Sequence, residues 1–208
     1  MPPGARASAA GGGERALRLA RVERRTAETA VTVALTLDGA GESVVATGVP
    51  FLDHMLTALA RHSGFDLEVH ARGDLAVDPH HTVEDTGIVL GQALREAVGS
   101  GQGIVRFASQ HVPMDDALVL AAVDVGGRPY LHYGLTVPPQ LLGTFPTDLA
   151  REFFRAFTTH AAVTLHLVQW HGENAHHVLE AAFKGTGIVL GRATRVRGEA
   201  IPSTKGVL

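Results

Sequence analysis

DPHHTVE at residues 78–84 and NAHHVLE at residues 174–180 repeat one arrangement 96 residues apart, and this repeat decides the fold. Each copy holds two adjacent histidines and a glutamate three positions after the second histidine. On a helix each residue advances about 100° around the axis, so the histidines diverge while the glutamate, about one turn on, falls between them in angle. One such helix can serve two metal ions. The second copy supplies matching ligands, which predicts an internally duplicated protein with a dinuclear metal site.

The composition limits the classes of function that remain. The chain has 208 residues, of which 45% are hydrophobic, enough for a sizeable core. The formal net charge of -3 gives no basic field for nucleic acid. The absence of cysteine excludes disulfides, thiolate ligands and a cysteine nucleophile. Because no apolar run approaches the roughly 20 residues that span a bilayer, we expect a cytoplasmic protein without a membrane or nucleic acid partner.

The expected order of elements begins with strands. Residues 1–15 are rich in alanine, glycine and proline without periodicity, and we expect a disordered tail there. Alternating apolar residues at 31–37 predict a strand that turns at 39–41 and forms a hairpin with residues 44–45. The order β-β-β-α-β-α is then completed by a helix from Pro50, a strand at 65–71 and a helix ending near Val98.

The second half is expected to repeat this order, with strands at 117–125, 130–137 and 163–169 and helices at 147–160 and from Asn174. The predicted fold class is α+β, an internal duplication of a β-β-β-α-β-α unit. The two homologous halves, about 16–100 and 101–208, would form one domain of residues 16–208. Because each half would be a sheet with helices on one face, the helices of both halves are expected to pack between two sheets.

The candidate metal ligands are nitrogen and oxygen donors without sulfur. The segment Asp53-His54 at a helix start offers His54, and the two repeats supply six more ligands: His80, His81, Glu84, His176, His177 and Glu180. Such donors suit Mn, Fe, Co or Zn, and the carboxylates favour six-coordinate Mn over tetrahedral structural zinc. A lone histidine more often caps a helix or bonds to a carboxylate in a buried polar network. The repetition of the whole set favours metal binding.

The last predicted helix is rich in glycine. GTGIVLG at residues 185–191 echoes TGIVLG at residues 86–91. Each interior glycine costs about 1 kcal/mol relative to alanine. From the sequence alone we expect these glycines to weaken the helix.

Six motifs in one order carry a family resemblance. They are Phe51-Leu52-Asp53-His54-Met55, His80-His81-Thr82-Val83-Glu84-Asp85, Gly127-Arg128-Pro129, Asn174-Ala175-His176-His177, Glu180-Ala181-Ala182-Phe183-Lys184 and Pro202-Ser203-Thr204-Lys205-Gly206. From about Arg21 to its end the chain resembles imidazoleglycerol-phosphate dehydratase of histidine biosynthesis. The resemblance implies a fold like domain 2 of ribosomal protein S5 (ribosomal protein S5 domain 2-like) and a hydro-lyase with two Mn2+ per active site.

The implied reaction is the Mn-dependent elimination of water from D-erythro-imidazole glycerol phosphate, which gives imidazole acetol phosphate. The proton removed lies on an unactivated carbon and the hydroxyl is a poor leaving group. The reaction therefore gives a reason for two metals, which can hold the ring nitrogens of the substrate and polarise a hydroxyl. The resemblance also implies substrate-binding residues whose polar and cationic groups hold and offset the phosphate dianion: Arg106, Arg128, Lys184, Ser203 and Lys205.

The resemblance assigns roles to further residues and places all seven ligands named above on metal positions. Glu28 matches a substrate-contacting glutamate and is assigned to proton transfer, and Glu28, His80 and Glu180 are the expected catalytic residues. Glu152 stands where many relatives have a histidine before Phe-Phe. Because a carboxylate can replace imidazole at a hard divalent ion, Glu152 is the expected eighth ligand. For Glu28 and Glu152 the alternative is a solvated surface glutamate.

Two other classes of function would use part of the same set. A dinuclear metallohydrolase would use the same ligands, with a metal-bound hydroxide attacking phosphorus. A metal-storage assembly would need the ligands but has no use for Arg106, Arg128 or the tail at 203–205. The resemblance further implies a small phosphorylated imidazole as substrate and a homo-oligomer of 24 subunits, built from trimers with the sites at subunit contacts.

Overall fold

The first half of the chain forms one four-stranded sheet and two helices. The structure is a computed structural model that describes residues 17–206, so the tail predicted at residues 1–15 lies outside the described residues. The sheet has the order β1-β2-β4-β3, in which β3 and β4 are parallel and the other neighbours antiparallel. The elements are β1 (Leu19–Arg25), β2 (Thr29–Thr36), β3 (Ser43–Ala46), α1 (Pro50–Ser63), β4 (Asp66–Gly73) and α2 (His80–Val98).

The second half repeats this topology. Its sheet has the order β5-β6-β10-β7, in which β7 and β10 are parallel and the other neighbours antiparallel. The order and the strand directions match those of the first half, which confirms the predicted duplication. The elements are β5 (Phe107–Met114), β6 (Ala117–Asp124), β7 (Tyr130–Gly134), a small hairpin of β8 (Leu141–Leu142) and β9 (Phe145–Pro146), α3 (Leu149–Ala161), β10 (Thr164–His171) and α4 (Ala175–Ala193).

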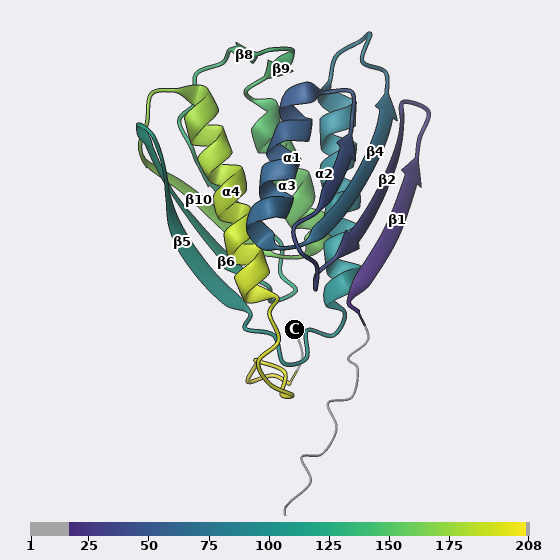
Figure 1. Ribbon diagram of the computed structural model, residues 1–208, viewed down its shortest axis with the longest axis vertical. Coiled ribbons are helices and arrows are strands. Elements are labelled where there is room, and N and C mark those ends of the chain that lie inside the picture. The colour runs from purple at the N-terminus through teal and green to yellow at the C-terminus, as the bar shows by residue number, and fades with distance from the viewer. Residues whose placement is uncertain (1–16, 207–208) are drawn as a thin grey trace, which may run out of the picture.

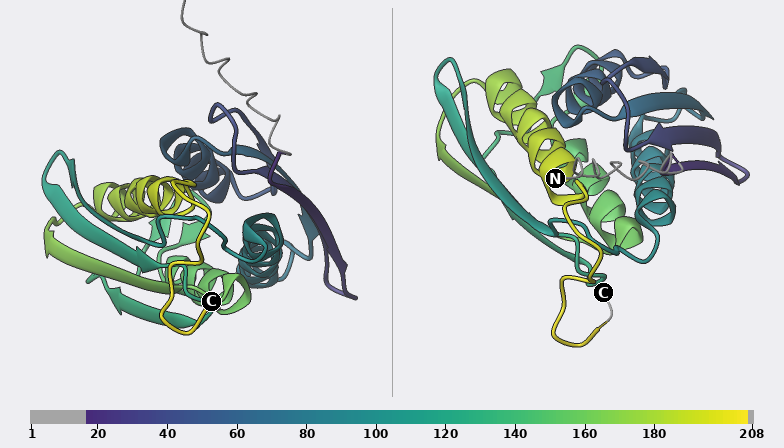
Figure 2. Two further views of the ribbon diagram at one scale, coloured as in Figure 1. Left: turned by 90° about the horizontal axis from the view of Figure 1, so that it is seen from below. Right: turned by 60° about the horizontal axis from the view of Figure 1, so that its bottom comes forward.

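The two sheets are the outer layers of the molecule and the four helices lie between them (Figure 1). Viewed from below, the helices fill the space between the inner faces of the sheets (Figure 2). The central strands β2 and β6 alternate strictly between buried and half-buried residues, as expected of strands with one face on the core. This layered arrangement confirms the predicted α+β class with the helices of both halves packed between two sheets.

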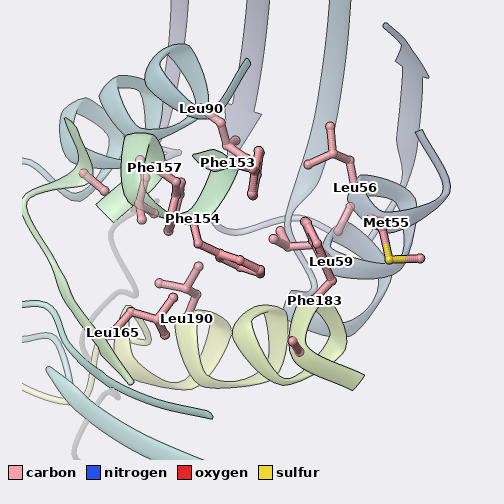
Figure 3. Packing of buried hydrophobic residues seen from close by; sticks show 14 of the residues in the cluster. Met55, Leu56, Leu59, Leu90, Phe153, Phe154, Phe157, Leu165, Phe183 and Leu190 are labelled. Atoms are coloured by element: carbon pink, nitrogen blue, oxygen red, sulfur yellow. The ribbon is translucent and has the colours of Figure 1, made fainter. Parts of the chain in front are cut away.

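The helices pair across the duplication rather than within each half. Helix α1 packs on α4, and α2 packs on α3. Each pair therefore contains one helix from either half, and a single cluster of buried side chains takes residues from both halves. Phe153 and Phe154 of α3 lie 5.2 and 4.6 Å, between ring centroids, from Phe183 of α4 at the centre of this cluster (Figure 3).

Glycines allow the paired helices to approach backbone to backbone. A Cβ added to Gly91 would lie 2.6 Å from the carbonyl oxygen of Phe157 on α3, and a Cβ on Gly187 would lie 2.5 Å from that of Leu59 on α1. Gly191 is in similar close contact with the Ser63 carbonyl. The glycine-rich stretch, expected from its sequence to weaken the last helix, is thus needed for helix packing.

Close helix packing also explains why the two glycine-rich stretches resemble each other. The repeated histidines are 96 residues apart, whereas Gly87 and Gly187 are 100 residues apart, a difference of about one helical turn. A shift of one turn keeps the glycines on the same face of the helix. The position in α4 that corresponds to Gly87 is occupied by Phe183, which fills the core instead. The echo is therefore set by helix crossing and not by the register of the duplication.

Two details of the predicted strands are wrong. Strands β2 and β3 do not form a hairpin, because β4 lies between them and β3 pairs with β4 in parallel. The predicted turn exists, but it is fastened to β4: the Asp66 carboxylate accepts the backbone N–H groups of Ala40 and Glu42 at 2.8 and 3.0 Å. Strand β5 was not predicted, because this edge strand contains Pro113 and few alternating apolar residues.

We predict that Gly187→Ala destabilises the protein. The new Cβ would overlap the Leu59 carbonyl, and overpacking of this kind typically costs about 1–3 kcal/mol, more than the gain in helix propensity of about 1 kcal/mol. Chemical denaturation measures the free energy of unfolding. Gly185→Ala on the same helix is the control, because its neighbours are the methyl groups of Ala121 at 3.0 Å and Val112 at 3.3 Å, which require a shift of only a few tenths of an ångström. Equal stabilities of the two variants would contradict the packing role.

Candidate functional site

All four helices begin at the same end of the molecule, which brings the candidate metal ligands together. Within each sheet the two strands that lead to the helices are parallel, β3 with β4 and β7 with β10, and each helix runs back in the opposite direction (Figure 1). His54 lies near the start of α1, and Glu152 near the start of α3. The two histidine repeats open α2 and α4. The eight predicted ligands therefore lie at the helix starts, and this end is called the ligand end below.

The chain fixes these helix starts with short polar side chains. The Asn174 side chain accepts the backbone N–H of His176 at 2.9 Å and caps α4. Asp78, at the matching place of the first repeat, accepts the N–H of His80 at 2.7 Å. In α1 the Asp53 carboxylate accepts the Thr47 N–H at 2.9 Å. The ligands are thereby placed on rigid helix ends.

Three of the predicted ligands form a compact cluster. His54, His176 and Glu180 each offer a ligand atom, and these atoms all lie within 4.8 Å of one another. The Glu180 Oε2 atom is 3.0 Å from His176 Nε2 and 3.6 Å from His54 Nε2, while its Oε1 atom is 2.8 Å from the Lys184 ammonium. One carboxylate oxygen is thus held by a cation and the other faces two imidazoles.

The charge state of Glu180 follows from these contacts. Burial acts to raise the pKa of the carboxyl group, but the hydrogen bond and charge of Lys184 and the hydrogen bond from His176 outweigh it, so the pKa is lowered. Glu180 is therefore an ionised carboxylate at neutral pH, as a metal ligand must be.

A second cluster occupies the equivalent place between α2 and α3. The Glu84 Oε2 atom is 3.9 Å from His80 Nε2, and its Oε1 atom is 3.2 Å from the Arg155 guanidinium. The same guanidinium is 2.5 Å from Glu152. Here too one oxygen of the central glutamate is held by a cation while the other faces an imidazole.

The duplication makes Glu152 the counterpart of His54. Gly91 and Gly187 correspond, since they are 96 residues apart like the histidine repeats, and they contact the carbonyls of Phe157 and Leu59. Those two residues are 98 positions apart, and the same spacing takes His54 to Glu152. The second cluster thus replaces one imidazole of the first cluster by a carboxylate.

His81 and His177 belong to neither cluster and are held by aspartates instead. His81 Nδ1 is 3.0 Å from Asp74, which raises the pKa of the imidazole, and 3.7 Å from Glu28. His177 Nδ1 is 2.6 Å from Asp116. This bond and two backbone N–H groups lower the pKa of Asp116. The structure thus places Glu28, the expected proton-transfer residue, beside His81, one of the predicted ligands.

The predicted phosphate-binding residues form a pocket at the opposite end, with one exception. The pocket, called the cation pocket below, is lined by Arg106, Gly126, Gly127, Arg128, Ser203, Thr204 and Lys205. Arg106 has a positive φ of 75° and bonds to Asp124 at 2.7 Å and to the Pro202 carbonyl at 2.8 Å. Its bond to Asp124 raises its pKa and keeps it charged. Lys184 is not in this pocket, because it pairs with Glu180 at the ligand end.

The cation pocket and the ligand end of one chain are far apart. The Arg106 N–H donates to the carbonyl of Ala193, the last residue of α4, at 2.8 Å, whereas His176 lies in the first turn of that helix. A helix of 19 residues is about 28 Å long. A small ligand therefore cannot contact both places on one chain.

Sequence reasoning missed the residues that hold the ligands. Arg155, Asp74, Asp116 and Asp124 each contact a predicted site residue. Asp116 directly precedes the strand predicted at residues 117–125, and no motif singles it out. Arg155 lies three residues after Glu152, a spacing that indicates a helical ion pair and could have drawn attention to it.

The fold and the site define a class: a duplicated α+β enzyme with histidine and carboxylate clusters at one end and a cationic pocket at the other. Residues 47–190 match the family model described as imidazoleglycerol-phosphate dehydratase. A protein of that name from Ruegeria pomeroyi is 52% identical over 195 residues, which cover 92% of this chain and all of the relative. One from Desulfitobacterium hafniense is 53% identical over 194 residues, which cover 92% and 99%.

Solved structures agree with the sequence comparisons. The dehydratase of Staphylococcus aureus superposes with a TM-score of 0.78 at 37% identity, covering 86% of this chain and 99% of that one. The protein of Pyrococcus furiosus, in complex with (S)-C348, gives 0.79 at 41% identity, covering 90% and 100%. The chain belongs to the imidazoleglycerol-phosphate dehydratase family, and is an enzyme, a hydro-lyase of histidine biosynthesis. Within residues 17–206 no helix combines the length and hydropathy of a membrane span, and the cytoplasmic location stays a prediction.

We predict that His54→Gln removes one bound divalent ion per chain. The substitution takes one imidazole from the compact cluster while Glu180 and His176 remain. Elemental analysis after loading with Mn2+ and gel filtration counts the ions. The control is His62→Gln, two turns further along α1 and outside the cluster. Equal metal content in the two variants would show that the cluster holds no ion.

Proposed function

We propose that the chain catalyses the Mn-dependent elimination of water from D-erythro-imidazole glycerol phosphate, giving imidazole acetol phosphate. The observation that carries the proposal is the cluster of His54, His176 and Glu180, whose ligand atoms lie within 4.8 Å of one another. The second set is more open: Glu84 is 3.9 Å from His80 and is linked to Glu152 through Arg155. Two such clusters match a dinuclear site for a reaction in which an imidazole substrate carries two ring nitrogens. The cation pocket at the other end suits the phosphate.

The donors of both clusters fit manganese. They are imidazole nitrogens and carboxylate oxygens without sulfur, and Glu180 keeps Oε2 toward both histidines of its cluster. His54, His176 and Glu180 would hold one ion, and His80, Glu84 and Glu152 the other. When bound, the metals supply Lewis acidity toward the substrate ring and hydroxyl.

The side chains of the chain supply proton transfer and phosphate binding. Glu28 is exposed at the turn between β1 and β2, 3.7 Å from His81, so its carboxylate can reach a substrate proton at the ligand end. We assign proton transfer to it. At the other end the Arg106 and Arg128 guanidiniums share Asp124 and face the same pocket as Lys205. A phosphate group there would accept charge-assisted hydrogen bonds from them.

We further propose that one active site is built from more than one subunit, in a homo-oligomer of 24 chains assembled from trimers. The length of α4 separates the ligand end from the cation pocket by about 28 Å. A substrate that touches both therefore needs the cation pocket of a neighbouring chain. In such an assembly His81 and His177, which lie outside the compact cluster of their own chain, would serve the metal of a neighbour.

The first experiment is turnover of imidazole glycerol phosphate by metal-stripped protein before and after addition of Mn2+. We expect activity only with the metal and imidazole acetol phosphate as product. Release of inorganic phosphate from phosphomonoesters instead would indicate a metallohydrolase. Tight metal binding without turnover would indicate a storage protein.

Mixing two inactive variants tests the shared site. His54→Ala removes a ligand and Arg106→Ala removes a phosphate contact at the other end, so each homo-oligomer is expected to be inactive. After dissociation and reassembly together, some sites combine an intact ligand end with an intact cation pocket, and activity is expected to return. The control mixes His54→Ala with His176→Ala, which damage the same cluster. Recovery in the control alone, or in neither mixture, would contradict a site shared in this way.

A further inference from the structure

Two histidines at the ligand end are bonded to aspartates through the same ring nitrogen. His81 Nδ1 lies 3.0 and 3.3 Å from the two carboxylate oxygens of Asp74, and His177 Nδ1 lies 2.6 Å from Asp116. A neutral imidazole that donates its Nδ1–H to a carboxylate carries its free lone pair on Nε2. In both cases the nitrogen left for a ligand is the one at the tip of the ring.

The two aspartates do not correspond in the duplication. Asp74 follows β4 in the loop before α2, whereas Asp116 lies in the turn between β5 and β6. His81 and His177 themselves are corresponding residues of the repeat. The internal duplication therefore does not account for both aspartates. The same arrangement is reached from two different segments, which indicates that the ring orientation matters and not only the histidine.

We propose that Asp74 and Asp116 are positioning residues that fix His81 and His177 with Nδ1 protonated, so that Nε2 is presented to a metal ion. The inference rests on the proposed metal-dependent function and adds to it two residues outside the ligand set. Carboxylates that hold a ligand histidine in this way also strengthen it as a donor, and their loss typically lowers metal affinity about 10- to 100-fold.

Two other carboxylates lie near the same imidazole rings, and their contacts differ from those of Asp74 and Asp116. Asp115 Oδ2 is 3.4 Å from His177 Nε2, the opposite ring nitrogen from the one that Asp116 contacts. The Asp115 side chain is 73% exposed. Glu28 is 3.7 Å from His81 Nδ1, beyond hydrogen-bond distance. Asp116 also accepts the backbone N–H groups of Glu173 and Asn174, so it fastens the loop before α4 as well.

The test compares Asp74→Asn, Asp116→Asn and Asp115→Asn with the unaltered full-length protein. Mn2+ is added to metal-stripped protein and free Mn2+ is followed by electron paramagnetic resonance. We expect Asp74→Asn and Asp116→Asn to weaken binding of one ion about 10- to 100-fold, and Asp115→Asn to leave it unchanged. Thermal unfolding in EDTA reports structural damage separately. Asp74→Asn is the decisive variant, because Asp74 does not fasten the α4 loop.

The outcomes separate this inference from the proposed function. If the unaltered protein, Asp74→Asn and Asp116→Asn all bind Mn2+ equally well, the inference is overturned and the proposed function is not. A lower unfolding temperature with unchanged Mn2+ affinity would also overturn it, since the aspartates would then be merely structural. Failure of the unaltered protein to bind Mn2+ would overturn the metal-dependent function and the inference with it.

Discussion

The close crossing of helices from opposite halves is the contact on which the rest of the structure depends. Glycine at 91 and 187 removes the side chain at each crossing, so that α2 meets α3 and α1 meets α4 backbone to backbone. The same crossings assemble the ligand clusters. His54 of the first half meets Glu180 of the second, and Glu84 of the first half lies across Arg155 from Glu152 of the second. Neither half alone contains a complete cluster.

The sequence predicts the elements and the ligand types, because both depend on local spacing. It does not predict which elements become neighbours. The prediction of a hairpin at residues 31–45 was wrong because the turn packs on β4. Gly39 lets the turn approach Asp66 of that strand, and no local sequence pattern indicates this contact. The pairing of Lys184 with Glu180 is different, because the two residues are four positions apart on α4 and this spacing is visible in the sequence.

The two clusters share one electrostatic feature and differ in another. In each, a cation holds one oxygen of the central glutamate, but the cation comes from the same helix at Lys184 and from the neighbouring helix at Arg155. The second cluster also holds Glu152 where the first holds the imidazole of His54. The extra carboxylate makes it richer in oxygen, and hard divalent ions favour oxygen ligands. The guanidinium of Arg155 offsets part of that added negative charge.

The positions of the site residues constrain how copies of the chain can assemble under the proposed function. His81 and His177 bond to aspartates and lie outside the compact cluster of their own chain, so under the proposed function they call for contact between ligand ends. The cation pocket, about 28 Å away, calls for a second contact between unlike ends. One twofold pair offers a single self-complementary patch, so it does not provide both. Unlike contacts form a closed ring only where the rotation between chains closes, and under the proposed function a ring of three joined through a second interface would satisfy both requirements.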